Sequence, residues 1–345
     1  MKALKKERIN FNLVIFLLLL VTITFSLFYG AVKVPILEIF KIILNKTGLS
    51  DFEIAKKGFI PIIFYVRLPR IFVSILVGGA LAVSGCTMQS ILKNPIADSS
   101  IIGISSGASL GAVLAIATGL STQYIFAMPI FSIFFSLLVS SLVYRISVMR
   151  GRTDNLLLIL SGIAISSFVS AISSLILTNL MESQIREYVF WSVGSLSGRR
   201  WEHFFLGLAP ISILSLVLFY YGKELNILLL GDEEAKSLGI NVAFMRKKIL
   251  VMVAILTAMS VCISGNIGFI GLVIPHVLRR IIGPDNRKLL KASFLAGAFF
   301  LNLSDLISRL VLSPAEISVG IITALIGAPY FVYLIIKFRR GGREI

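Results

Sequence analysis

Charged residues are scarce in this chain, and the scarcity argues against a soluble fold. Only 14% of the 345 residues are charged, whereas a soluble domain carries about 25%. Hydrophobic residues make up 57% of the chain, and the mean hydropathy is +0.95. Several apolar runs reach the roughly 20 residues that a helix needs to cross a bilayer. The composition therefore predicts an all-α polytopic membrane protein.

The motifs of catalysis, nucleotide binding and metal binding are also missing. The chain contains no GxxxxGK[ST] phosphate loop, no HExxH and no CxxC. Its two cysteines, Cys86 and Cys262, lie inside apolar runs, and its two histidines, His203 and His276, are isolated in the sequence. We expect no catalytic residues, no metal site, no cofactor and no disulfide.

The net charge of +16 does not indicate a nucleic-acid partner, because Lys and Arg cluster at the ends of the apolar runs. With the N-terminus in the cytoplasm, about twice as many Lys and Arg fall on the cytoplasmic side as outside, which predicts that both termini are cytoplasmic.

The basic start and the apolar run Phe11 to Tyr29 resemble a signal peptide. The length of the run and the lack of a clean cleavage site favour a retained first span.

Ten apolar segments are predicted to span the membrane within a single domain, 1–345. They are 11–29, 67–92, 101–118, 124–145, 156–180, 201–221, 248–264, 271–282, 289–311 and 317–338. Pro69 fits the first turn of the second span, and an amphipathic piece, 35–44, is expected at the membrane interface. Four spans precede the sixth and four follow it, and the two groups enter from opposite sides, as in an inverted repeat.

The segment 224–242 is too polar to cross a bilayer, and the charge distribution places it in the cytoplasm. It contains a predicted helix of about two turns, Glu233 to Leu238, with Asp232 as N-cap and Gly239 at the C′ position. The residues expected to form and cap this helix are Asp232, Glu233, Glu234, Ala235, Leu238 and Gly239. A helix this short is marginal in water, so it needs a partner surface, although an ordinary capped loop helix has the same pattern.

Small residues and proline mark two of the spans. Gly103, Gly107 and Gly111 are spaced by four and share one helix face, where small residues let helices approach closely. Others flank or interrupt the short eighth span: Gly268, Gly271 and Pro275. A broken helix at membrane depth is tolerated against protein or a water-filled cavity. Tight packing and the lining of a transport pathway both fit this pattern.

Three arginines are predicted at the outer membrane surface. Arg67 and Arg70 begin the second span, and Arg309 lies four residues after Asp305 near the outer end of the ninth. An i, i+4 acid and base is a sensible way to place charge near a membrane edge. Arg309 is then also free to meet an external partner. Snorkelling of the arginines to lipid head groups is the alternative interpretation.

Six stretches, in order along residues 60–338, carry a resemblance. They are RLPRIFVSILVGGALAVSG, KNPIADSSIIGISSGASLGAV, WSVGSLSGRRW, LNILLLGDEEAKSLGINV, SGNIGFIGLVIPHVLRRIIGPDNRKLL and EISVGIITALIGAPYF. They resemble the signature blocks of the FecCD-like permeases, the membrane subunits of type II ATP-binding-cassette (ABC) importers for iron-siderophores, haem and cobalamin. The resemblance implies a non-catalytic, ten-helix permease that works as a homodimer in the cytoplasmic membrane of a bacterium or archaeon. It also implies two cytoplasmic ATPase subunits, which hydrolyse the ATP, and an extracytoplasmic substrate-binding protein.

The resemblance assigns roles to residues already singled out. Glu234, Ala235 and Gly239 match the family's cytoplasmic coupling motif, which docks on the ATPase. The three arginines match those that receive acidic residues of the binding protein. The GSL that follows Trp191 favours an iron chelate, with cobalamin as the alternative. A rival from another class is an ion-gradient-driven secondary transporter. It would need intramembrane acids, of which Asp305 is the only clear one.

Overall fold

The computed structural model describes residues 11–340 except 31, 47, 49–51, 53, 55, 57, 150 and 151. The helices of the first half are α1 (Phe11–Phe28), α2 (Ile36–Lys46), α3 (Phe59–Pro61), α4 (Leu68–Ile91), α5 (Ile104–Ala117), α6 (Leu120–Gln123), α7 (Ala127–Ser147) and α8 (Asn155–Leu177). They continue as α9 (Glu182–Ser192), α10 (Trp201–Tyr220), α11 (Gly222–Leu230), α12 (Asp232–Ser237), α13 (Val242–Ser264), α14 (Ile270–Ile282), α15 (Asn286–Leu310) and α16 (Val319–Arg340). The short elements are a π-helical turn, η1 (Ile62–Arg67), a 3-10 turn, η2 (Ser99–Ile102), and a hairpin of β1 (Val148–Met149) and β2 (Arg152–Thr153).

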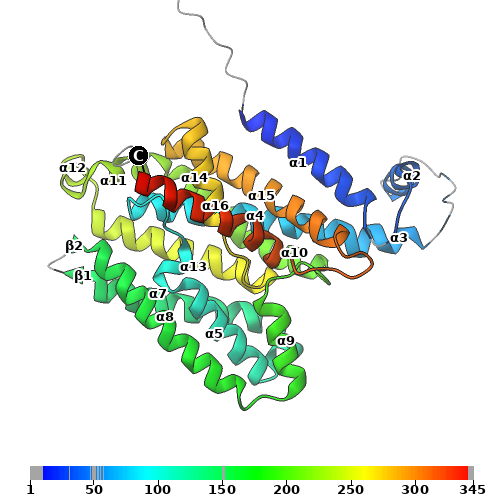
Figure 1. The fold of residues 1–345 in the computed structure, drawn as a ribbon, viewed down its shortest axis with the longest axis horizontal. Helices are drawn as coiled ribbons and strands as arrows, with labels where there is room; N and C mark the ends of the chain where they lie inside the picture. The colour runs from blue at the N-terminus through cyan, green and yellow to red at the C-terminus, as the bar shows by residue number, and fades with distance from the viewer. Residues whose placement is uncertain are drawn as a thin grey trace, which may run out of the picture.

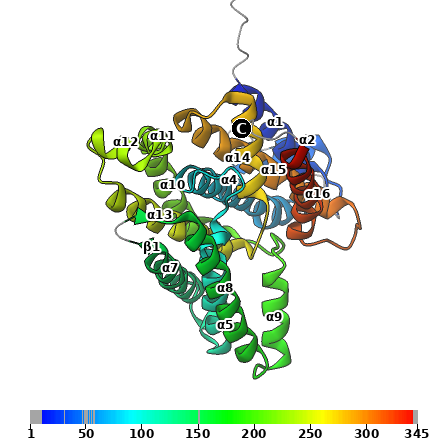
Figure 2. The same cartoon turned by 60° about the vertical axis from the view of Figure 1, so that its left-hand side comes forward.

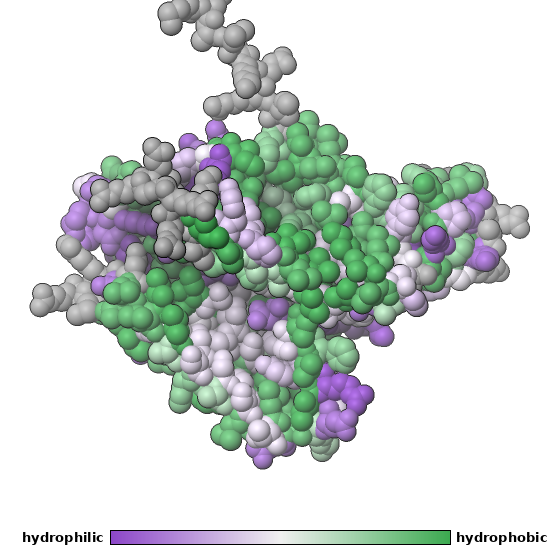
Figure 3. All heavy atoms as spheres, in the orientation of Figure 1, coloured by the Kyte–Doolittle hydropathy of each residue, from purple (hydrophilic) through white to green (hydrophobic). Residues whose placement is uncertain are grey.

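The predicted all-α membrane fold is confirmed. Long helices run side by side, with α12 at one end of the bundle and α2 at the other (Figure 1). Hydrophobic residues cover much of the middle of the molecule, and hydrophilic residues gather towards its ends (Figure 3). This distribution matches a protein whose flank faces lipid and whose ends face water.

Seven helical segments in the described part of the chain are long and apolar enough to cross a membrane. They are Phe11–Phe28, Phe59–Ile91, Ala127–Ser147, Leu156–Leu177, Trp201–Tyr220, Val242–Ser264 and Asn286–Leu310. The other three predicted spans coincide with α5, α14 and α16; α5 and the apolar part of α16, Val319–Leu334, fall below the length required of a span. The presence of ten membrane spans therefore remains a prediction.

The second span begins earlier than the sequence predicted. Helical structure runs without a break through α3, η1 and α4, from Phe59 to Ile91. Pro69 therefore follows a π-helical turn in mid-helix instead of opening the span. The 33 residues would extend about 50 Å at 1.5 Å each, whereas the hydrocarbon core is about 30 Å thick. The start of this helix therefore projects beyond the membrane, where Ile63 packs with Val34, Ile39 and Ile42 of the α2 region.

Several helices at the α12 end of the bundle begin with a side-chain cap. The Asp154 carboxylate accepts hydrogen bonds from the backbone N–H groups of Leu156 and Leu157 at the start of α8. Asn241 caps α13, and Asp285 caps α15 in the same way. These polar residues satisfy N–H groups that have no partner inside a helix. They also mark where the chain returns from water into the apolar core.

The helix contacts follow the pattern of an inverted repeat. If α4, α5, α7 and α8 correspond to α13, α14, α15 and α16, every major contact among these eight helices has a counterpart. Within the groups, the contacts α5–α7, α7–α8 and α5–α8 correspond to α14–α15, α15–α16 and α14–α16. Between the groups, α4 packs on α15 and α14, and in the same way α13 packs on α7 and α5. Figure 2 shows α5, α7 and α8 in one part of the molecule and α14, α15 and α16 in another, with α4 and α13 between them. The two halves are thus interlocked, because each central helix packs on the opposite group.

Glycine makes the tightest of these contacts possible. A Cβ atom on Gly107 would lie 2.5 Å from the backbone oxygen of Phe135, and one on Gly111 would meet the backbone at Phe131. Gly103 has a φ of +74° and precedes α5, so the predicted third span is interrupted there by a left-handed residue. The face shared by these glycines packs on α7, which is the close approach that the spacing predicted.

We expect Gly107→Ala to lower stability by about 1–3 kcal/mol, since overpacking forces neighbouring backbone apart. The matched control is Gly268→Ala, because no atom lies within 4 Å of a Cβ at that position. Thermal unfolding of both variants in detergent tests this. Equal midpoints would show that the α5–α7 contact is not tightly packed.

Candidate coupling and docking sites

The short helix predicted in the segment 224–242 is present as α12, Asp232–Ser237. It ends as expected, because Gly239 has a φ of +83°. The Gly239 N–H donates to the oxygen of Lys236 at 2.9 Å, and the Ile240 N–H donates to the oxygen of Ala235 at 3.0 Å. These two bonds form a Schellman motif, which satisfies carbonyl groups at the helix end. The side chain of Ala235 is buried against the bundle.

The prediction that Asp232 is the N-cap is wrong. Gly231 caps α12 with an extended, positive φ of +148°, and Asp232 is the first helical residue. The Asp232 carboxylate instead accepts two hydrogen bonds from the Arg246 guanidinium in α13, at 2.7 and 3.0 Å. Arg246 is buried, so its charge needs a partner, and this need outweighs local capping. The pair ties α12 to a helix that crosses the molecule.

The preceding helix, α11, is fixed to the start of α15. Asn226 donates its amide N–H to the Asp285 carboxylate at 2.7 Å, and its amide oxygen accepts from the backbone N–H of Asn286 at 2.8 Å. The hydrogen bond from Asn226 is the largest influence on Asp285 and helps to hold the pKa of this carboxyl below its usual range. The α11–α12 unit is therefore attached to both α13 and α15, and a push on it would reach both helices.

The outer surface of α12 is exposed. Glu233, Glu234 and Leu238 are exposed, and Leu238 is 60% exposed although it is apolar. Exposed leucines and phenylalanine also flank the helix at Leu230 and Phe244. Large exposed apolar side chains rimmed by polar residues are typical of a protein contact site.

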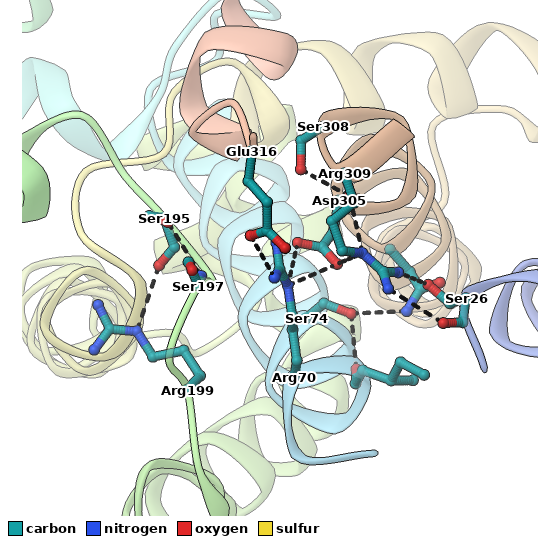
Figure 4. A network of polar contacts seen from close by, with 12 residues as sticks. Ser26, Arg70, Ser74, Ser195, Ser197, Arg199, Asp305, Ser308, Arg309 and Glu316 are labelled. Atoms are coloured by element: carbon teal, nitrogen blue, oxygen red, sulfur yellow. Dashed lines mark hydrogen bonds and ion pairs between the residues drawn. The ribbon is translucent and has the colours of Figure 1, made fainter. Parts of the chain in front are cut away.

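The structure brings Arg70 and Arg309 together on one buried carboxylate at the opposite end of the bundle. Asp305 is 0% exposed and lies 2.9 Å from Arg70 Nε and 3.2 Å from Arg309 Nε. Arg70 Nη1 also donates to Glu316 at 2.8 Å, from the loop before α16. Figure 4 shows the two guanidinium groups on either side of Asp305. The predicted i, i+4 pair of Asp305 and Arg309 is present, and it forms part of a larger network.

The expectation that these arginines are exposed is wrong. Arg67, Arg70 and Arg309 are 4%, 5% and 5% exposed. Arg67 donates to the backbone oxygens of Leu27, Phe28 and Val32, and Arg309 donates to the backbone oxygen and hydroxyl of Ser26 and to the backbone oxygen of Tyr29. They hold the end of α1 against α4 and α15, because a guanidinium carries several donors that buried carbonyls can use. The sequence could not show this, since the partners lie far away along the chain.

Glu316 and Arg246 are the residues that sequence reasoning missed. Glu316 lies in the EIS stretch before the last span, and Arg246 opens the seventh span. Their charge close to an apolar run was a usable signal. Their partners were not visible, because Glu316 and Arg70 are separated by most of the chain.

The residues around the eighth span serve packing to different degrees. Gly271 lies against Gly85 of α4, and a Cβ atom on Gly271 would be 2.9 Å from the backbone oxygen of Leu81. Pro275 is buried inside α14, whereas Gly268 has open space around it. Among the described residues, no group of three or more His, Cys, Asp or Glu is arranged to hold a metal ion.

We expect Asp305→Asn to destabilise the protein by about 3–5 kcal/mol, because two buried guanidinium groups lose the charge that compensates them. Glu316→Gln is the matched control. The Glu316 side chain is 32% exposed, so its pair should contribute no more than about 1 kcal/mol. Thermal unfolding in detergent compares the two variants, and an Asp305→Asn midpoint equal to that of Glu316→Gln would contradict the shared-carboxylate arrangement.

Comparison with known proteins agrees with this architecture. The model of the FecCD transport family matches residues 18–337. An uncharacterized ABC transporter permease protein of Bacillus subtilis, YvrB, is 36% identical over 345 residues, covering 99% of this chain and 98% of the relative. The hemin transport system permease protein HmuU of Yersinia pestis is 40% identical, covering 79% of this chain and 83% of that protein.

A solved structure has the same fold. It is described as an inward-facing conformation of a putative metal-chelate type ABC transporter. The TM-score is 0.81 at 34% identity, covering 94% of this chain and 98% of the other. The family match, the relatives and the shared fold lead to one conclusion: the chain belongs to the FecCD transport family and is a membrane permease of a type II ABC importer.

Proposed function

We propose that this chain is the translocation subunit of an importer for an iron chelate, either a siderophore complex or haem. The relatives named for hemin and for iron chelatin support this substrate class. Relatives of similar identity are named for cobalamin and for molybdate import, and cobalamin is the alternative. The chain has no chemistry of its own in this proposal, because a separate ATPase supplies the energy.

The observation that carries the transport mechanism is the surface of α12. Ala235, the pair of Asp232 and Arg246 and the Schellman turn fix this helix to the bundle, yet Glu233, Glu234 and Leu238 point to water. We assign the contact with a cytoplasmic ATPase to this surface. Closure of two ATPase subunits on ATP would then move α12, and the attachment of α11 and α12 to α13 and α15 would pass the motion to the membrane helices. Both termini and α12 lie in the cytoplasm in this arrangement, and the protein sits in the cytoplasmic membrane.

A second copy of the chain is assigned to the face formed by α16. Gly320, Ala324 and Ala328 line a shallow groove there, and Ile321 and Leu325 beside them are 43% and 66% exposed. Small residues allow a second helix to approach closely, and exposed large ones can interlock with it. A twofold dimer would place two such faces opposite one another around a central pathway.

The network of Asp305, Arg70, Arg309 and Glu316 is assigned to the docking of an extracytoplasmic binding protein. Arg67, Arg70 and Arg309 are buried, so an acidic group from outside must approach at the position of Glu316, the exposed member of the network.

Reversal of the arginine charges would not test docking cleanly, because it would also disturb the fold. Glu316→Gln is the better probe. We expect it to leave folding nearly unchanged and to strengthen docking by up to about fivefold, because the removal of one competing charge changes the free energy by up to about 1 kcal/mol. Docking measured with the protein in nanodiscs would contradict this assignment if the affinity did not change.

We expect Leu238→Asn to weaken binding of the ATPase subunit by about tenfold, because truncation of a central interface side chain costs more than about 1 kcal/mol. Leu312→Asn is the matched control, since Leu312 is 58% exposed at the opposite end of the bundle. Co-purification of the ATPase and uptake in membranes measure the effect. Normal binding and uptake in Leu238→Asn, at normal protein abundance, would remove α12 from the interface.

The substrate and the energy source are tested together in proteoliposomes that hold the permease, its ATPase and its binding protein. We expect uptake of a labelled ferric siderophore or haem that requires ATP and is insensitive to uncouplers. ATP-dependent uptake of cobalamin alone would select the alternative substrate. Uptake by the permease alone, driven by an ion gradient, would instead make it a secondary transporter, in which Asp305 would be the first candidate to carry ions.

A further inference from the structure

A cavity of about 430 Å³ lies away from both α12 and the Asp305 network, at the ends of α7, α9, α10 and α13 that are opposite to α12. Its walls are mainly apolar and include Met128, Phe190, Leu206 and Ile263. Its polar residues are Arg199, His203, Glu187, Ser121, Ser195 and Ser197. Neither the coupling helix nor the outer arginine network uses this space.

Arg199 enters this cavity without a carboxylate partner. It lies on the loop between α9 and α10, and none of the ion pairs within the described ranges includes it. Its Nε donates to the backbone oxygen of Ser195 at 3.4 Å, a long hydrogen bond to a neutral group. Figure 4 shows the guanidinium beside Ser195, turned away from the Asp305 network. Burial lowers the pKa of Arg199, so the surroundings do not compensate its charge.

The His203 ring lies beside Arg199 in the same cavity. Its Nδ1 lies 3.3 Å from the backbone nitrogen of Arg200, and its Nε2 lies 3.3 Å from Arg199 Nη1. Both neighbouring groups are donors, but a neutral imidazole has only one nitrogen that accepts. If Nδ1 accepts from the Arg200 N–H at the start of α10, then Nε2 carries the hydrogen and faces the guanidinium. An acceptor within reach of both Arg199 Nη1–H and His203 Nε2–H would then satisfy the two donors.

We propose that this cavity binds an anionic phosphate group, whose oxygens accept hydrogen bonds from the Arg199 guanidinium and from Nε2–H of His203. Arg suits this ligand because its planar fork matches phosphate oxygens. The Ser195 hydroxyl, which accepts from the Ser197 N–H at 3.1 Å, has its own hydrogen available for the same ligand. Glu187 is the carboxylate in the wall, and it accepts a hydrogen bond from Ser121 at 3.4 Å.

The position of the cavity fits two sources of phosphate. Arg199 lies two residues before the start of α10, a helix long enough to span the membrane, so it lies near the depth of lipid head groups, where basic pockets between helices bind anionic lipids. The apolar wall could then take the glycerol and acyl part of a phospholipid. Free phosphate from the outer solution would need only the polar residues. The chemistry at Arg199 and His203 is the same for both.

The first test uses the unmodified protein. The chain has only two histidines, so selective ¹⁵N-histidine labelling of the full chain in maltoside micelles gives few signals, and His203→Gln assigns them. We add phosphatidylglycerol, phosphatidylcholine with the same acyl chains, or inorganic phosphate. The His203 signals should shift with phosphatidylglycerol and saturate, whereas those of His276 should not move.

The second test compares neighbouring arginines by native mass spectrometry with added phosphatidylglycerol. Arg199→Gln should retain about tenfold less lipid, since a hydrogen bond to a charged group contributes about 1.5–3 kcal/mol. Arg200→Gln is the matched control, because Arg200 is exposed and does not line the cavity. It should retain lipid like the unmodified chain.

The results of these tests distinguish an anionic lipid from free phosphate as the ligand. A His203 response to phosphatidylglycerol but not to inorganic phosphate supports the lipid, and a response to both supports a site for any phosphate. The absence of a His203 response to both ligands would overturn the proposal, whether or not Arg199→Gln folds. If His203 responds to phosphatidylglycerol, equal lipid retention by the Arg199→Gln and Arg200→Gln variants would overturn the assignment of Arg199 to this ligand.

Discussion

Backbone-to-backbone contact between helices is the constraint on which this structure depends. Lipid is as apolar as leucine, so burial of apolar side chains gives helices little reason to associate inside a membrane, and close packing must hold them together. Gly78 of α4 and Gly297 of α15 meet with no room for a Cβ atom on either side, and Gly85 of α4 meets Gly271 of α14 in the same way. The helix α4 is therefore the center of one set of contacts, and the symmetrical contact pattern places α13 at the center of the other.

The few buried charges serve this packing at the two ends of the bundle. At one end, Asp305 compensates two arginines, whose other donors bind the end of α1 and the Glu316 loop. At the other end, Arg246 holds Asp232 and with it α12. Charges at these positions are costly unless they are paired, so each pair fixes one geometry. The two ends of the bundle are thus each held rigidly and are joined by intact helices.

Arg199 differs from these arginines because no carboxylate pairs with it in the described part of the chain. Its guanidinium is partly buried, lies beside the backbone oxygen of Ser195 and the His203 ring, and makes no ion pair within the described part of the chain. The contrast with Arg70, which has two carboxylates, is the reason to assign Arg199 to a ligand and Arg70 to the fold.

The sequence by itself determined the membrane class, the approximate positions of the long helices, the short helix that ends before Gly239, and the glycine face of α5. These features depend on local composition and spacing, which a single segment carries. Only the tertiary structure decided what the charged residues do. Asp232 pairs with Arg246 instead of capping its helix, the three arginines are buried instead of exposed, and the helix of the second span begins at Phe59 instead of at Arg67. In each case the deciding partner comes from a distant part of the chain, and the free energy of a buried, paired charge or a packed helix exceeds the small local preferences that a sequence pattern reports.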